Sequence, residues 1–369
     1  MIRKDKGNNG SVPHKINVMV TKRVREEARK HFNCSTLEGG ELENQGGKGT
    51  ALAHWEKRLF ENEGMTGATT QNSVFSRMTL ALMEDTGWYK VDYSLAEPLH
   101  WGENMGCLFA KNSCKAWMSF QRSAKETIAP FCDILDSPSE GKHTKCTVDH
   151  RSVAICNLGE YTAPLPVEYQ YFEFLPGIAM PQNYGGTVAL ADYCPYFQAL
   201  TWTKAGKQVR GSTCRFGENT PVQENNYGME YYGKTATCVE QGSHWSKTKC
   251  GVKWIARDWG SGCYNHLCDN SGLWIVIEGY KYRCFHKGQI LDVRVQNQDG
   301  WDFRGSIVCP ACKEVCYERR NLCPAEIKPP PANSQPSPVI SEVTCAAIQN
   351  HGTSSILYIN MLFVLALSL

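Results

Sequence analysis

The segment HFNCSTLEGGELENQGGKGTALAHWEKRLFENEGMTG spans residues 31–67, and it carries the pattern on which the fold assignment depends. It contains His54 and, eleven residues later, Met65. Glycines precede His54 and bracket Met65, so the chain around both residues is predicted to form loops and turns. A catalytic zinc needs about three protein ligands and an open position for water. Histidine is a common zinc ligand, so His54 is a candidate for one such ligand.

The rest of the sequence does not complete that site. No two of the ten histidines stand four positions apart, the spacing that places two imidazoles on one helical face. Glu56, Glu61 and Glu63 follow His54, but without a histidine pair nothing holds a zinc-bound water in front of them. No base role is therefore assigned to these glutamates. Taken alone, His54 would be interpreted as an ordinary hydrogen-bonded residue.

Segment 31–67 resembles the part of the leishmanolysin-type zinc metallopeptidases, major surface proteases of trypanosomatid parasites, that supplies the third zinc histidine and the Met-turn. The resemblance implies that His54 is a Zn²⁺ ligand and that Met65 lies beneath the metal. In that family, the other two histidines and the general-base glutamate lie in an HExxH helix. No HExxH occurs in this sequence, so we expect one zinc ligand, no catalytic residue and no complete zinc site.

Three later motifs extend the resemblance over roughly residues 16–325. They are CNLGEYTAPLPVEYQYF from Cys156, ADYCP from Ala191 and GSIVCPACKEVC from Gly305. The implied fold class is α+β, with an incomplete metzincin-like catalytic portion of helices and loops followed by a disulfide-rich, mainly β C-terminal domain. The family resemblance also implies a disulfide between Cys34 and Cys107.

Local patterns predict two helices in the N-terminal part. The first runs from Thr21, as the N-cap, to Phe32, and the second from Ser73 to Thr86, with Gly87 as its stop signal. The expected buried stripes are Val20, Val24, Ala28 and Phe32 in the first helix, and Phe75, Met78, Leu82 and Met83 in the second.

Composition limits the class of protein. The chain has 369 residues, of which 42% are hydrophobic, so it can bury at least one large core. Its formal charge of +2 gives no strong field to attract nucleic acid, and no nucleic-acid partner is expected. Eighteen cysteines are typical of a disulfide-bonded extracellular or lumenal protein.

The close spacing of Cys309, Cys312, Cys316 and Cys323 is compatible with structural zinc or with redox chemistry, but disulfides are the simpler interpretation in a chain so rich in cysteine. His143 and His150 are seven residues apart, and the Pro, Gly and polar residues around them favour a solvent-exposed loop.

The sequence divides into four parts. Residues 1–110 are the remainder of the catalytic domain, 111–323 the cysteine-rich domain, 324–344 a proline-rich extended stalk, and 345–369 a signal for a glycosylphosphatidylinositol (GPI) anchor. The apolar run Ile356–Leu369 is too short to span a bilayer comfortably, and the small residues Cys345, Ala346 and Ala347 are candidate attachment sites. A short membrane or core helix is the alternative.

The opening residues MIRKDKGNNGSVPHK have no apolar core, so no signal peptide is expected there, and with the missing HExxH this indicates a truncated chain. Glycosylation sequons occur at Asn9 and Asn33.

Two functions follow. One is a GPI-anchored cell-surface zinc metalloendopeptidase that acts on proteins or peptides, including host surface proteins, and is inactive in this form. The other is a non-enzymatic surface adhesion protein or truncated remnant.

Overall fold

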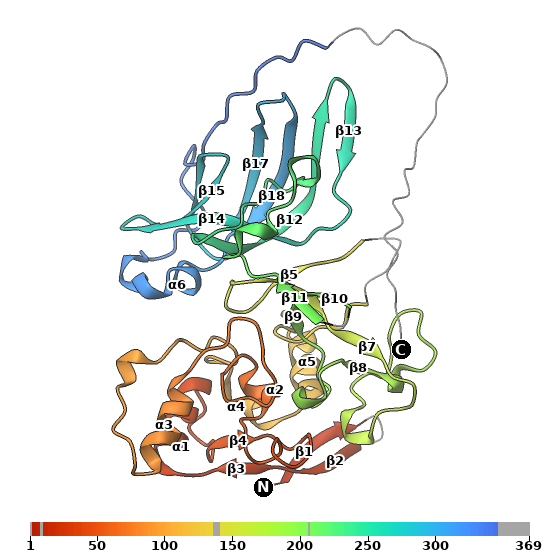
Figure 1. Ribbon diagram of the computed structural model, residues 1–369, viewed down its shortest axis with the longest axis vertical. Helices are drawn as coiled ribbons and strands as arrows, with labels where there is room; N and C mark the ends of the chain where they lie inside the picture. The colour runs from red at the N-terminus through yellow and green to blue at the C-terminus, as the bar shows by residue number, and fades with distance from the viewer. Residues whose placement is uncertain (1, 8–9, 136–140, 206, 346–369) are drawn as a thin grey trace.

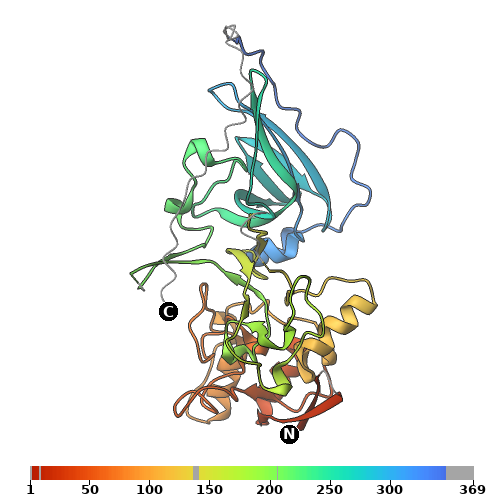
Figure 2. The ribbon, with the colours of Figure 1, turned by 90° about the vertical axis from the view of Figure 1, so that its right-hand side faces the viewer.

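The computed structural model describes residues 2–7, 10–135, 141–205 and 207–345. Helices gather at one end of the long axis and a large antiparallel sheet at the other (Figures 1 and 2). The predicted α+β class, with a mainly β and disulfide-rich C-terminal part, is confirmed. No helix in the described ranges is long and apolar enough to cross a bilayer. Asn9, Ala346, Ala347 and Ile356–Leu369 lie outside these ranges.

The helices of the N-terminal half are α1 (Lys22–Phe32), α2 (Lys57–Phe60), α3 (Arg77–Asp85), α4 (Gly106–Lys111) and α5 (Cys114–Ser123). In α1, Val24, Ala28 and Phe32 are fully buried at four-residue steps, because this spacing keeps them on one helical face. Val20 precedes the helix and is 54% exposed, so its predicted place in the buried stripe is wrong.

Helix α3 begins at Arg77, not at Ser73 as predicted. Ser76 is its N-cap, and the Ser76 side chain accepts a hydrogen bond from the Met78 N–H at 3.2 Å. The chain before it is extended because Val74 exchanges backbone hydrogen bonds with Asn62 and Gly64. Phe75 therefore lies outside the helix and is 59% exposed rather than buried.

Short strands surround the helices and connect them to the sheet. They are β1 (Ile2–Gly7), β2 (Gly10–Lys15), β3 (Asn17–Met19), β4 (Gly40–Leu42), β5 (Lys145–Cys146), β6 (Val153–Cys156), β7 (Leu158–Glu160), β8 (Tyr184–Gly186), β9 (Phe197–Ala199), β10 (Thr201–Lys204) and β11 (Lys207–Gly211). They pair as β1–β2, β3–β4, β5–β6–β9, β7–β8 and β10–β11, all antiparallel.

The large sheet has the strand order β16-β15-β14-β12-β18-β17, with β13 paired to the distal part of β12. Its strands are β12 (Ala236–Lys249), β13 (Val252–Ile255), β14 (Ser261–Asp269), β15 (Gly272–Ile277), β16 (Tyr280–Cys284), β17 (Ile290–Gln296) and β18 (Asp302–Val308). Strand β17 alternates buried Leu291, Val293 and Val295 with exposed residues, the period of a strand with one face in a core.

Short helices complete the fold. They are α6 (Cys312–Val315) and the 3₁₀ helices η1 (Tyr93–Leu95), η2 (Val167–Tyr169), η3 (Pro181–Asn183), η4 (Ala189–Ala191), η5 (Gly217–Asn219), η6 (Gln223–Asn225) and η7 (Tyr317–Leu322).

The helical end and the sheet end of the molecule each have a main hydrophobic core. The first combines residues of α1–α5 with later ones such as Phe131 and Tyr196, so it extends across the composition boundary at residue 110. The second fills the β12–β18 sheet around Trp245 and Tyr264. A small third cluster of Val153, Cys214, Ala236, Cys238 and Cys263 joins them.

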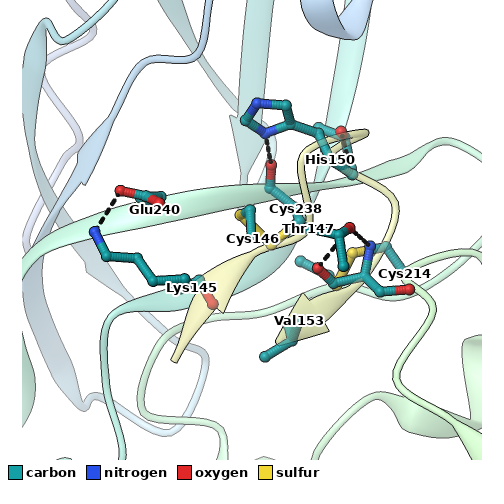
Figure 3. Close-up of a disulfide and its surroundings, with 12 residues drawn as sticks. Lys145, Cys146, Thr147, His150, Val153, Cys214, Cys238 and Glu240 are labelled. Carbon is teal, nitrogen blue, oxygen red and sulfur yellow. Dashed lines mark hydrogen bonds and ion pairs between the residues drawn. A yellow bond between two sulfur atoms is a disulfide. The ribbon is translucent and has the colours of Figure 1, made fainter. Parts of the chain in front are cut away.

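All the cysteines are paired, since no described cysteine is free. The nine disulfides are Cys34–Cys107, Cys114–Cys194, Cys132–Cys156, Cys146–Cys238, Cys214–Cys263, Cys250–Cys345, Cys268–Cys316, Cys284–Cys309 and Cys312–Cys323. All four cysteines between residues 309 and 323 therefore form disulfides. Figure 3 shows Cys146–Cys238, which joins β5 to β12 beside the Lys145–Glu240 ion pair.

Neither His143 nor His150 is freely exposed, so that prediction is wrong. His150 lies in a loop, but its Nδ1 donates to the Cys238 carbonyl at 3.0 Å and its Nε2 is 3.6 Å from a Glu314 oxygen, which leaves the side chain 15% exposed (Figure 3). His143 packs on the Trp259 ring, with centroids 4.9 Å apart. The loop folds back on the sheet, and this contact between distant segments leaves both residues only partly exposed.

Residues 324–345 are extended, as their proline content predicts, but they lie along the sheet instead of projecting from it. The Ile327 N–H donates to the Phe285 carbonyl, and the Ser341 N–H donates to the Gln296 side chain at 2.8 Å. Cys345 ends this segment in its disulfide with Cys250.

Candidate functional site

His54 and Met65 lie on two extended segments that pair side by side, and the His54 segment pairs with the end of β4. Leu42 forms an antiparallel bridge with Trp55, and Trp55 a parallel bridge with Thr66. The Glu43 N–H donates to the His54 carbonyl at 2.9 Å, and the Trp55 N–H donates to the Met65 carbonyl at 2.9 Å. This pairing brings the His54 ring to Met65, where Nδ1 is 3.2 Å from the Met65 carbonyl oxygen.

This contact decides which ring nitrogen of His54 carries the proton. A carbonyl oxygen only accepts, so Nδ1 must be the donor, and in the neutral ring the lone pair is then on Nε2. No hydrogen bond joins Nε2 to any residue in the described ranges, and the side chain is half-buried. A histidine that holds a metal through one nitrogen commonly donates its other N–H to a carbonyl. His54 therefore has the hydrogen bonding expected of a zinc ligand.

The described part of the chain does not complete a zinc site around His54. Its two groups of three closely spaced potential ligands are Cys312, Cys316 and Cys323, and Glu41, Glu56 and Asp192, and neither group includes His54. The three cysteines are in disulfides. The carboxylates surround Arg58. The chemistry of His54 thus fits the metal, while these residues supply no second ligand beside it.

Glu63 holds the turn at Met65. One of its carboxylate oxygens accepts the Met65 N–H at 2.6 Å, and the other accepts the Ser76 N–H and hydroxyl, each at 3.1 Å, and the Thr79 hydroxyl. Burial raises the pKa of Glu63, which is 1% exposed. Glu63 thus fixes the backbone under His54 and has no access to a water. No sequence signal set it apart from its neighbouring glutamates.

Arg58 is the centre of a buried charge cluster behind this turn. Its guanidinium lies 3.3 Å from a Glu41 oxygen and 3.4 Å from an Asp192 oxygen, and it donates to the Phe109 and Asn112 carbonyls at 3.2 and 3.1 Å. Arg58 and Asp192 are 1% and 0% exposed. A charge pair desolvated to this degree depends on both partners being present.

Carboxylates outnumber cations in this region. Burial, followed by the charges of Asp192, Glu43 and Glu41, raises the pKa of Glu56 well above its usual range. Burial also raises the pKa of Glu43 to about 7. Lys57 neutralises little of the negative charge of these carboxylates, because its ammonium donates instead to the Glu61 carbonyl and the Thr70 hydroxyl, each at 2.6 Å. Burial therefore favours the neutral forms of Glu43 and Glu56.

The remaining predicted residues lie apart from His54. Cys34 and Cys107 form a disulfide between the end of α1 and α4. Asn33 is exposed and has a left-handed backbone, with φ 53°, at the C-cap of α1. Cys345, a candidate anchor residue, is bonded to Cys250 at the far end of the sheet.

Comparison with known proteins gives a consistent result. A family model described as Leishmanolysin matches residues 3–322. A leishmanolysin-like peptidase of Drosophila melanogaster is 46% identical over 89% of this chain and 48% of its own length, and one of Caenorhabditis elegans is 42% identical over 83% and 47%. Leishmanolysin of Leishmania major is 26% identical over 84% of this chain and 46% of its own length. The chain spans about half the length of these curated relatives.

Proposed function

The chain belongs to the leishmanolysin family, and we propose that it forms the part of a zinc metalloendopeptidase that supplies the third zinc histidine, His54, with Met65 beneath the metal. The observation that carries this proposal is the Nδ1 contact of His54 with the Met65 carbonyl, which leaves Nε2 as the lone-pair nitrogen. Bound zinc would activate a water and polarise a peptide carbonyl. The contribution of this chain is to hold and orient one ligand.

The 369 residues by themselves are proposed to be inactive, because no described residue adds a ligand beside His54 and the sequence has no HExxH. Catalysis then requires a segment that brings two further histidines and a base. The substrates would be proteins or peptides, the class that a peptidase family acts on. The nine disulfides support folding in an oxidising compartment, and a GPI anchor attached near Ala346 or Ala347 would place the protein at a cell surface.

The experiment compares the chain alone with a form that carries, ahead of residue 1, the HExxH-containing segment of a relative. Zinc per chain is measured by mass spectrometry of the metal, and casein cleavage is followed with and without a chelator. We expect zinc and chelator-sensitive cleavage only in the joined form, and the loss of both in its His54→Ala variant. His286→Ala is the matched control, since His286 is half-buried like His54 and its ring has a hydrogen bond only with the neighbouring Lys287 carbonyl among described residues.

Stoichiometric zinc and cleavage by the chain alone would refute its proposed inactivity. Zinc retained after His54→Ala would refute the ligand role. The second candidate is a non-enzymatic surface adhesion protein. A joined form that also bound no zinc would refute the ligand role of His54 and leave this candidate.

A further inference from the structure

The hairpin formed by the end of β12 and by β13 exposes apolar side chains at its tip. Val252, Trp254 and Ile255 are 45%, 48% and 60% exposed. Cys250 and Gly251 have φ angles of 49° and 80° between the paired residues Lys249 and Val252, the signature of a tight two-residue hairpin turn. Strand β13 pairs only with β12 among the described strands, so this tip (residues 249–255) forms an edge of the sheet, at the end where β12 still pairs with β18.

The hairpin tip carries both apolar and basic side chains. Val252 and Trp254 point to one face and Lys253 and Ile255 to the other, because successive residues of a strand alternate. Lys249 adds a second cation, whose ammonium donates to the Asp299 carbonyl at 2.6 Å. Tryptophan and lysine beside aliphatic side chains suit the boundary between lipid and water, where the indole lies at the headgroups and lysine stems extend toward water.

A disulfide connects this tip to the C-terminal segment. Cys250 in the turn is bonded to Cys345, with their Cα atoms 5.5 Å apart. Ala346 and Ala347, the proposed anchor positions, follow directly, and two extended residues reach about 7 Å. Beyond them, the sequence contains the apolar run Ile356–Leu369. The described chain therefore ends at Cys345 beside the hairpin tip, and the proposed anchor positions are next in the sequence.

We propose that the hairpin tip docks on a phospholipid bilayer, with Val252 and Trp254, which share one face, inserted at the headgroup level. The tip lies at the end of the long axis opposite to α1–α4 (Figures 1 and 2). Docking in this way directs the end of the molecule that contains His54 away from the bilayer, toward proteins in solution. The inference rests on the membrane attachment proposed above, and it adds the surface that orients the molecule.

The test measures the depth of Trp254 in the full chain bound to vesicles. The protein is mixed with vesicles of phosphatidylcholine and phosphatidylserine, and the bound fraction is isolated by flotation. Bound wild type is then compared with Trp254→Phe in vesicles with and without brominated acyl chains, which quench nearby indoles. The difference between the two proteins is the emission of Trp254. Trp88→Phe is the matched control, because Trp88 is 85% exposed and closely follows α3, a helix at the other end of the molecule (Figure 1).

We expect brominated lipid to reduce the Trp254 emission by at least about twofold and to leave the Trp88 emission unchanged. Bound protein in which Trp254 is not quenched, or in which both indoles are quenched equally, would refute the docking surface while leaving membrane attachment intact. Failure of the full chain to float with vesicles would also refute the docking, and it would leave the proposed GPI anchor, which is attached only in cells, untouched. Since both tryptophans are exposed and phenylalanine keeps an aromatic side chain, each variant should fold.

Discussion

Replacing Arg58 by methionine tests the buried cluster behind the His54 turn. The substitution removes the cation between Glu41 and Asp192 and also the donor for the Phe109 and Asn112 carbonyls. Removing one partner of a buried charge pair costs about 3–5 kcal/mol, because the opposite charge stays buried. We expect a loss of about 4 kcal/mol in unfolding free energy at pH 7.5.

The loss should shrink in acid. Without the guanidinium, Glu41 and Asp192 are buried with no cation beside them, so the folded protein favours their neutral, protonated forms. A carboxyl with a raised folded pKa stabilises the fold below its unfolded pKa, and this contribution disappears as the pH rises through the folded pKa. At pH 5 the two groups take up protons on folding, so the expected loss is only about 2 kcal/mol.

Urea unfolding with the disulfides intact, followed by tryptophan fluorescence, measures these losses. Trp55 and Trp101 are buried in the same core, and the Trp101 indole donates to the Arg58 carbonyl at 3.0 Å. A variant that also carries Glu41→Gln and Asp192→Asn should recover at least about 2 kcal/mol at pH 7.5. A loss below about 1 kcal/mol, or an equal loss at both pH values, would contradict the assignment of a buried ion cluster.

Three further changes test the neighbourhood of His54. Glu43→Gln should leave the free energy of unfolding unchanged at pH 5 and raise it by roughly 1–2 kcal/mol at pH 8. The reason is that the folded pKa of Glu43 is about 7, so the wild type loses stability as the pH rises through that value. Equal effects at both pH values in urea melts would contradict this prediction. Glu63→Gln should cost about 1–3 kcal/mol and speed hydrogen exchange of the Met65 amide, and unchanged exchange would show that Glu63 does not hold the turn. Replacing Cys34 and Cys107 together by alanine should lower stability by roughly 2–4 kcal/mol, and an unshifted thermal melt would refute a stabilising disulfide.

The sequence determined the class of the protein. The apolar periodicity located α1, because apolar residues at four-residue steps form one face of a helix. The density of cysteines indicated a disulfide-bonded fold. The spacing of His54 and Met65 within a glycine-rich segment was enough to indicate the family. Each of these signals is local in the chain, so it can be interpreted without knowing which distant segments meet.

Only the tertiary structure decided what surrounds His54. Asp192 reaches Arg58 from a distant part of the chain, and no local pattern links them. Ser73 has the sequence of a helix cap, yet Val74 pairs with residues 62 and 64 and delays α3 to Arg77. Long-range hydrogen bonds overrode local preference there because they satisfy backbone groups that the core would otherwise bury unpaired. The tautomer of His54 has the same origin, since the Met65 carbonyl that sets it reaches the ring only when the two segments pair.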